Sequence, residues 1–263
     1  MSEIRLIIHG GAGDIPDDTL KVYQKNLKGI WEVGHKLLQD GWDSLSVVEK
    51  VITLMEDSGV FDAGLGSFPN KEGYIEMDAS IMTSDGRAGA VGGVRMVRNP
   101  IRLARLVMEE TPHVMLVGEG AERFAERYDL PSFYPKEIPR RFSTDTVGAV
   151  AIDKRGLISA GTSTGGIRDK LPGRVGDSPI ISAGTYASFW GGVSATGLGE
   201  DIIKFGLAKK IDILLRQFSA QEAVDMVVSE GRMKGLEFGV IVLDRRGNMG
   251  VGYTTKAMAW YPR

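Results

Sequence analysis

Apolar positions in the first half of the chain change period several times, which marks out separate helices and strands. Residues 4–8 form a short, mostly apolar run that predicts a buried strand ending at a glycine-rich turn. From Asp18 to Gly41 the apolar residues recur at helical spacing, and a second helical pattern begins near residues 43–44. Ser46 and Glu49 have the spacing of a capping box in that second helix.

The pattern then returns to strands. Two runs, 75–83 and 88–94, flank the turn sequence Ser84-Asp85-Gly86 and predict a β-hairpin. The pair Asn99-Pro100 is typical of a helix start, with Pro at the first helical position. We further expect a strand at 113–117 and a helix at 119–127.

The second half begins after a proline-containing stretch, 129–145, that we interpret as an exposed linker. Two pairs of apolar runs follow, 147–152 with 157–162 and 240–243 with 249–254, each joined by an Asp-(Lys/Arg)-Arg-Gly turn. Helices are predicted at 200–215 and 221–229, the latter opened by a capping box from Ser219 to Glu222. Strands and helices in blocks favour an α+β fold, which we expect to form one domain over residues 1–263.

Composition narrows the function classes. The 263 residues carry 32 Lys and Arg against 34 Asp and Glu, so a nucleic-acid partner is not expected. The chain has 0 Cys, which excludes disulfides, thiolate metal sites and Cys nucleophiles. No apolar segment reaches the roughly 18 residues of a membrane span, and the N-terminus lacks the apolar core of a signal peptide. We therefore expect a cytoplasmic protein without membrane contact.

Several short motifs of metal, hydrolase and nucleotide sites occur only in part, without the other residues that such sites need. The 3 His residues form no cluster, so we predict no His-ligated metal. Residues 161–165 match the Gly-x-Ser-x-Gly nucleophile elbow, but no His follows Ser163, as that triad requires. The Gly-x-Gly pairs at 11–13 and 64–66 lack the third glycine of a dinucleotide loop, and we interpret both as tight turns.

Thr146 has more chemical promise. It lies where the proline-containing linker meets a buried strand, and taken alone it could simply start that strand. If the chain were cut before Thr146, the freed α-amine would have an ordinary pKa of about 8 and could act as a base near neutral pH. A threonine hydroxyl beside its own α-amine is a known activated nucleophile, and it needs no His.

The sequences around Thr146 resemble those of a known family. Matching blocks occur in order at 8–13 (IHGGAG), 61–67 (FDAGLGS), 145–151 (DTVGAVA), 161–166 (GTSTGG), 170–179 (KLPGRVGDSP), 183–187 (AGTYA) and 195–200 (ATGLGE), with a weaker match at 254–260. These blocks resemble the plant-type L-asparaginase/isoaspartyl peptidase family, threonine hydrolases of the N-terminal-nucleophile superfamily. The resemblance implies an αββα sandwich that hydrolyses the β-amide of L-asparagine and of β-aspartyl peptides.

The resemblance also implies roles for individual residues. It implies autocatalytic cleavage between Asp145 and Thr146, giving subunits 1–145 and 146–263 that stay associated and pair as a dimer of heterodimers. Thr146 is then the nucleophile and Thr164 tunes it. The oxyanion hole comes from Thr196 and Gly197, and the substrate head group is held by Arg174 and Asp177 with the backbone of Gly197 and Gly199. A zwitterionic amino acid needs one cation beside one anion, which is what Arg174 and Asp177 offer, although their spacing alone fits a surface ion pair equally well.

The chain departs from the family in ways that leave alternatives open. Asp62 replaces the usual Asn, an amide donor, with a group that only accepts when ionised. Asp145 is typical of glycosylasparaginases, which are the nearest rival, with protein-cleaving taspases behind them. A nonprocessing homologue that only binds acidic amino acids is the rival from another class. Ser182 stands where glycine is common, and the resemblance implies a structural Na⁺ held by carbonyls of the 55–65 loop, with no other cofactor.

Overall fold

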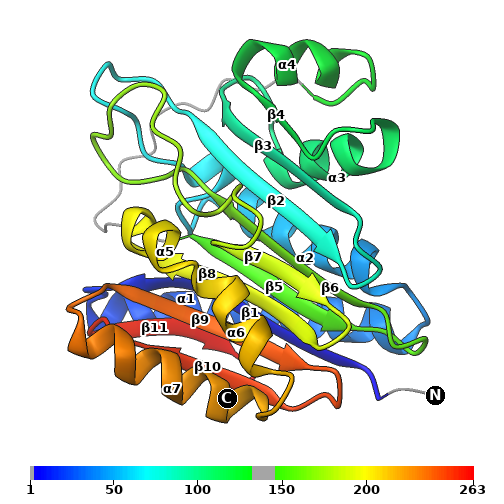
Figure 1. Cartoon of the computed structure of the whole chain (residues 1–263). Coiled ribbons are helices and arrows are strands. Elements are labelled where there is room, and N and C mark those ends of the chain that lie inside the picture. Colours follow the sequence, from blue (N-terminus) through cyan, green and yellow to red (C-terminus); the bar gives the residue numbers. More distant parts are fainter. Residues whose placement is uncertain (1–2, 132–145) are drawn as a thin grey trace.

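The computed structural model describes residues 3–131 and 146–263. Asp145, residues 1–2 and most of the predicted 129–145 linker lie outside the described residues. The described part contains two β-sheets with helices on either side (Figure 1). The expected combination of helices and mainly antiparallel sheets is therefore confirmed.

The larger sheet has seven strands in the order β11-β1-β5-β6-β2-β3-β4, and the smaller has four in the order β10-β9-β8-β7. All neighbours in both are antiparallel except β3 and β4, which are parallel. The larger sheet contains β1 (Arg5–Gly13), β2 (Met77–Thr83), β3 (Ala88–Val94), β4 (Met115–Val117), β5 (Val147–Ile152), β6 (Ile158–Thr164) and β11 (Ala257–Tyr261). The smaller contains β7 (Thr185–Ser188), β8 (Gly191–Gly197), β9 (Phe238–Asp244) and β10 (Met249–Tyr253).

Three apolar clusters explain how the layers stack. On β5, Val147 and Ala149 pack in the cluster that includes α1 (Asp17–Gln39), α2 (Ser44–Asp57) and α3 (Pro100–Glu110). The alternate residues Val150 and Ile152 belong to a different cluster, shared with Ile241 of β9. Successive side chains of a strand point to opposite faces, so β5 is covered by helices on one face and by the smaller sheet on the other.

The smaller sheet is covered in turn by its own helices. Residues of β8 and β9 form the third cluster together with α5 (Gly199–Phe205), α6 (Leu207–Leu214) and α7 (Ala220–Met233). The remaining helix, α4 (Gly118–Glu126), follows β4 at the edge of the larger sheet (Figure 1). Strands buried on both faces carry near-continuous apolar runs, which is why β1, β5 and β9 could be found from sequence.

The structure corrects several predicted boundaries. The helix expected over 200–215 is broken at Gly206, whose φ of 62° is left-handed, so α5 and α6 are separate. The second helix is capped by Asp43, which accepts from the Ser46 N–H at 2.9 Å, so a capping box starting at Ser46 was wrong. The capping box at the start of α7 is confirmed. Strands β7, β8 and β11 were not predicted. Within the described ranges, no helix is long and apolar enough to cross a membrane.

Candidate active site

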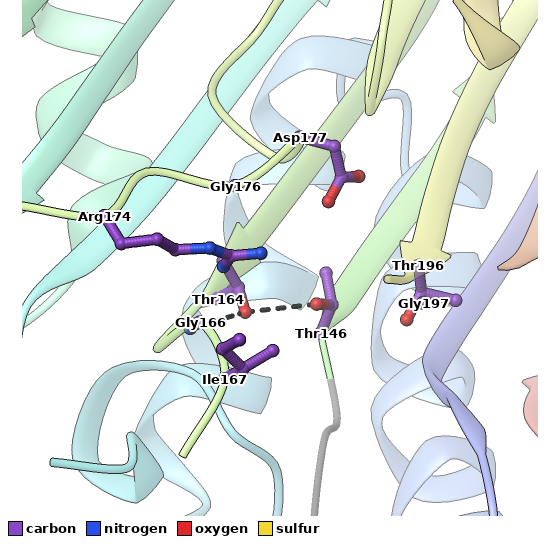
Figure 2. A pocket seen from close by; sticks show the side chains of 9 residues that line it. All are labelled: Thr146, Thr164, Gly166, Ile167, Arg174, Gly176, Asp177, Thr196 and Gly197. Atoms are coloured by element: carbon purple, nitrogen blue, oxygen red, sulfur yellow. Dashed lines mark hydrogen bonds between the residues drawn. The ribbon is translucent and has the colours of Figure 1, made fainter. Parts of the chain in front are cut away.

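Thr146 lies directly before β5, at the end of the strand where it meets β6. Val147 pairs with Ser163 in the antiparallel register, so Thr146 faces Thr164 at the end of the ladder. The Thr146 Oγ donates to Thr164 Oγ at 3.1 Å, and Thr164 Oγ also accepts from the Gly166 N–H at 2.9 Å (Figure 2). The predicted pairing of Thr146 with Thr164 is thus a direct hydrogen bond between buried hydroxyls.

Thr196 and Gly197 reach the same place from the smaller sheet. They end β8, which packs against β5 and β6, and both line one pocket with Thr146 (Figure 2). Gly197 has a φ of 131°, and a Cβ there would lie 2.5 Å from the carbonyl oxygen of Glu237. The position therefore requires glycine, and Gly197 itself lines the pocket. The pocket is lined by Thr146, Thr164, Gly166, Ile167, Arg174, Gly176, Asp177, Thr196 and Gly197.

Arg174 and Asp177 come from the loop between β6 and β7, and both line this pocket. Asp177 is buried, and burial raises its pKa to about 7. The positive charge of Arg174 lowers this pKa, but by less than burial raises it. Gly199, the last residue of the predicted substrate-binding set, does not line the pocket itself but lies next to Arg174 and Asp177. A Cβ on Gly199 would lie 2.8 Å from Arg174 Nη2 and 3.0 Å from Asp177 Oδ1. The structure therefore brings all the described residues of the predicted site together, with the anion of this pair buried and the cation partly buried.

One edge of the Arg174 guanidinium already forms hydrogen bonds with Glu200. Its Nε donates to Glu200 Oε1 at 3.0 Å and its Nη2 donates to Glu200 Oε2 at 2.8 Å. The side chain of Arg174 is 14% exposed, whereas that of Glu200 is 46% exposed. This bidentate pair was not predicted, although Glu200 is the last residue of one of the matching sequence blocks.

Polar residues at alternate positions on and before β2 hold the Arg174 loop in place. Glu76 accepts from the Gly173 N–H at 2.9 Å, and Asp78 accepts from the Gly176 N–H at 3.3 Å. Ser80 adds a bond from its Oγ to the Ser178 carbonyl at 2.6 Å. Positions i, i+2 and i+4 of a strand share a face, so this alternation in an otherwise apolar strand was a readable signal that sequence analysis did not use.

Lys170 is a buried cation behind the pocket. Its Nζ donates to the Glu76 carbonyl at 2.7 Å, and a Cβ on Gly166 would lie 2.8 Å from that nitrogen. Burial lowers the pKa of Lys170, while the carboxylates of Asp78, Asp62 and Glu76 act in the opposite direction. The ammonium group is therefore surrounded by three acids, and it compensates the charge that they bring into the interior.

Asp62, where the sequence departs from the pattern that it otherwise resembles, lies beside the residues that follow Thr164. It is fully buried, and its Oδ1 accepts from the Phe68 N–H at 2.9 Å. Its backbone carbonyl accepts from the Gly165 N–H at 2.9 Å, and a Cβ on Gly165 would lie 2.3 Å from Oδ1. The carboxylate of Asp62 also interacts electrostatically with the buried ammonium group of Lys170.

The buried His9 does not supply a base. Its Nε2 is 2.9 Å from Ser194 Oγ, and Ser194 bonds Thr162 at 2.7 Å, which accepts from Thr185 at 2.6 Å. Burial lowers the pKa of His9 to about 3, and a hydrogen bond with the Thr146 backbone raises it by a smaller amount. A neutral His9 therefore ties β1 to β8 through hydroxyl groups.

No cluster of three or more His, Cys, Asp or Glu that could hold a metal occurs in the part of the chain that the structure describes. In the 55–65 loop, Ala63 N–H donates to the Phe61 carbonyl at 2.9 Å and Gly66 N–H donates to the Ala63 carbonyl at 3.1 Å. These carbonyls keep a second lone pair, so the Na⁺ site there stays a prediction.

Comparisons with known proteins show relatives over nearly the whole chain. The asparaginase family model matches residues 2–141 and 134–262. The isoaspartyl peptidase/L-asparaginase of Mus musculus is 40% identical, over 97% of this chain and 86% of the mouse protein. The plant-type L-asparaginase of Pyrococcus abyssi is 39% identical, over 98% of this chain and 95% of its own, and the isoaspartyl peptidase of Escherichia coli is 38% identical, over 99% and 93%. The chain belongs to the asparaginase family.

Proposed function

We propose that this protein is a threonine amidohydrolase that cleaves the β-amide of L-asparagine and of β-aspartyl peptides. The observation that carries the proposal is the hydrogen bond of Thr146 Oγ to Thr164 Oγ, in a pocket that is also lined by the partly buried cation Arg174 and the buried acid Asp177. We propose that its layers are the αββα sandwich of the N-terminal-nucleophile type. The names of the relatives support the same substrate class.

The nucleophile is generated by cleavage between Asp145 and Thr146. The freed α-amine of Thr146, with an ordinary pKa near 8, takes the proton of its own hydroxyl. The two products, 1–145 and 146–263, stay together because hydrogen-bond ladders cross the cut. In the larger sheet β1 pairs with β5 and β2 pairs with β6, so each product contributes strands on either side of the other.

The reaction then follows acyl transfer. Thr146 Oγ attacks the β-carbonyl carbon of the substrate, and the resulting oxyanion is held by Thr196 and the Gly197 N–H, each such donor lowering the barrier by about 3 kcal/mol. The C–N bond breaks as the Thr146 ammonium returns its proton to the leaving ammonia or amine. The α-amine of Thr146 then takes a proton from a water molecule, and this water hydrolyses the β-aspartyl ester. The products are aspartate and the free Thr146 hydroxyl.

The substrate head group fits the charges of the pocket. The α-carboxylate binds the guanidinium of Arg174, and the α-ammonium binds Asp177 with the backbone around Gly197 and Gly199. Burial of Asp177 strengthens its attraction for an ammonium group, because the local dielectric is low. We further propose that two αβ units pair as a homodimer, which light scattering of the purified protein tests.

The experiment that tests the function starts from the Thr146→Ala variant. We expect purified wild type to give two bands on a denaturing gel, with a new N-terminus at Thr146, and the variant to remain at 28.5 kDa. Thr144→Ala, which removes a neighbouring hydroxyl, is the matched control and should still be cut. An unbroken wild type with full activity would refute the mechanism.

Substrate assays separate the alternatives. Hydrolysis of L-asparagine and a β-aspartyl dipeptide, with a glycosylated asparagine left intact, is the expected outcome. Preference for the glycosylated substrate would favour a glycosylasparaginase-like amidase. A chain that stays intact and binds aspartate without turnover would make it a nonprocessing binding protein.

A further inference from the structure

Glu200 occupies one edge of the guanidinium that the proposed function assigns to the substrate α-carboxylate. Its two oxygens accept from Arg174 Nε and Nη2 at 3.0 and 2.8 Å. An arginine carries five N–H donors in a fixed plane, so this pair uses two and leaves the Nη1 and Nη2 edge for another anion. Arg174 therefore cannot bind the substrate through its Nε edge while Glu200 is in place.

The guanidinium also packs closely against two glycines. A Cβ on Gly176 would lie 2.9 Å from Arg174 Nη1, and a Cβ on Gly199 would lie 2.8 Å from Nη2. The end of the side chain lines the pocket near Thr164 (Figure 2). Among the described residues, Glu200 is the one side chain that hydrogen-bonds to Arg174, and this bidentate contact fixes the rotation of the guanidinium plane.

We propose that Glu200 is a positioning residue that holds the Arg174 plane so that its Nη edge receives the substrate α-carboxylate. This inference rests on the proposed function. The alternative is that Glu200 acts as a competing anion, which the substrate carboxylate must displace from Arg174. The exposed fractions of the two side chains favour positioning. Glu200 is 46% exposed, so water screens its charge, whereas Arg174 is 14% exposed and is oriented by its contact with Glu200. An arginine that is already ordered loses less side-chain entropy when the substrate binds.

The test is the Glu200→Ala variant, assayed with L-asparagine. Release of the guanidinium should raise KM about fivefold to tenfold and leave kcat within twofold of wild type, since Glu200 does not contact the reacting atoms. Glu200→Gln keeps one acceptor oxygen and should give a smaller rise in KM. Glu237→Gln, which removes the charge of an exposed acid directly before β9, is the matched control and should leave both constants unchanged.

A second substrate separates positioning from a general loss of structure. In (R)-3-aminobutanamide a methyl group replaces the α-carboxylate of L-asparagine with the same spatial arrangement, so its KM should be the same in wild type and in Glu200→Ala. A KM for asparagine that falls or stays constant in Glu200→Ala would overturn the proposal, as would an equal rise for both substrates. Calorimetric titration with L-aspartate measures the affinity of wild type and Glu200→Ala without any turnover. If wild type binds aspartate but does not hydrolyse asparagine, the proposed function is wrong, while the effect of Glu200 on aspartate affinity is still measured.

Discussion

Glu56 gives the sharpest physical prediction, because it is an acid buried beside β6, the strand that ends in Thr164. It has no exposed surface, and its Oε1 accepts from Ser163 Oγ at 2.7 Å and from the Ile101 N–H at 3.1 Å. Burial raises the pKa of Glu56 from 4.5 to about 8, more than these hydrogen bonds lower it. Ser163 directly precedes Thr164, so Glu56 supports the strand that carries the proposed catalytic hydroxyl.

The sign of the effect on stability follows from linkage. Between pH 4.5 and 8 the folded Glu56 keeps a proton that the unfolded chain has lost, so its contribution to the free energy of unfolding falls as pH rises. Each unit of pKa difference corresponds to about 1.4 kcal/mol, and the part that develops between pH 5 and 8 is on the order of 3 kcal/mol. Stability from this residue is therefore fully present only below its unfolded pKa.

The assay compares Glu56→Gln with its parent by urea unfolding from pH 5 to 8. Both chains carry Thr146→Ala, so that a single uncut chain unfolds. The difference in unfolding free energy should shift in favour of Gln by about 3 kcal/mol across this range, because an amide cannot ionise and the other titrating groups cancel. Glu49→Gln, in the same helix but partly exposed, is the control. Parallel curves for Glu56→Gln and its parent would refute the reasoning.

Three further predictions concern the site and its supports. Burial raises the pKa of Asp177 to about 7, and the proposed Thr146 amine has an ordinary pKa near 8, so two groups must lose a proton. We expect kcat/KM for asparagine to fall by more than about tenfold per pH unit below pH 7; a fall of about tenfold per unit or less, as for the amine alone, would contradict the role of Asp177. Ser182 has a φ of 85°, which is unfavourable for a residue with a Cβ, so Ser182→Gly should raise the free energy of unfolding by about 0.5–1 kcal/mol in thermal or urea melts, and a loss of stability would be inconsistent. Thr164→Val removes the 3.1 Å contact to Thr146 and should lower kcat about tenfold or more in steady-state assays, whereas an unchanged kcat would exclude Thr164 as a tuning group.

Local patterns were sufficient for much of the fold. The apolar runs of β1, β5, β6 and β9 predicted strands because strands buried on both faces need continuous apolar sequence. Strand β8, with the sequence GGVSATG, was missed because its glycines have no strand propensity of their own. The close approach of neighbouring layers requires them, since a Cβ on Gly192 would lie 2.5 Å from Val150. Such contacts between distant segments leave no local pattern.

The sequence by itself determined which groups the proposed chemistry uses: a threonine after a predicted linker, and a motif that carries Arg174 and Asp177. These are visible because each depends on residue type and short spacing. Tertiary structure alone decided that Glu76 and Asp78 hold the backbone of the Arg174 loop, and that Glu200 takes one edge of its guanidinium. Those roles depend on the direction of a side chain across a sheet or a loop, and direction is set by packing between segments far apart in the chain.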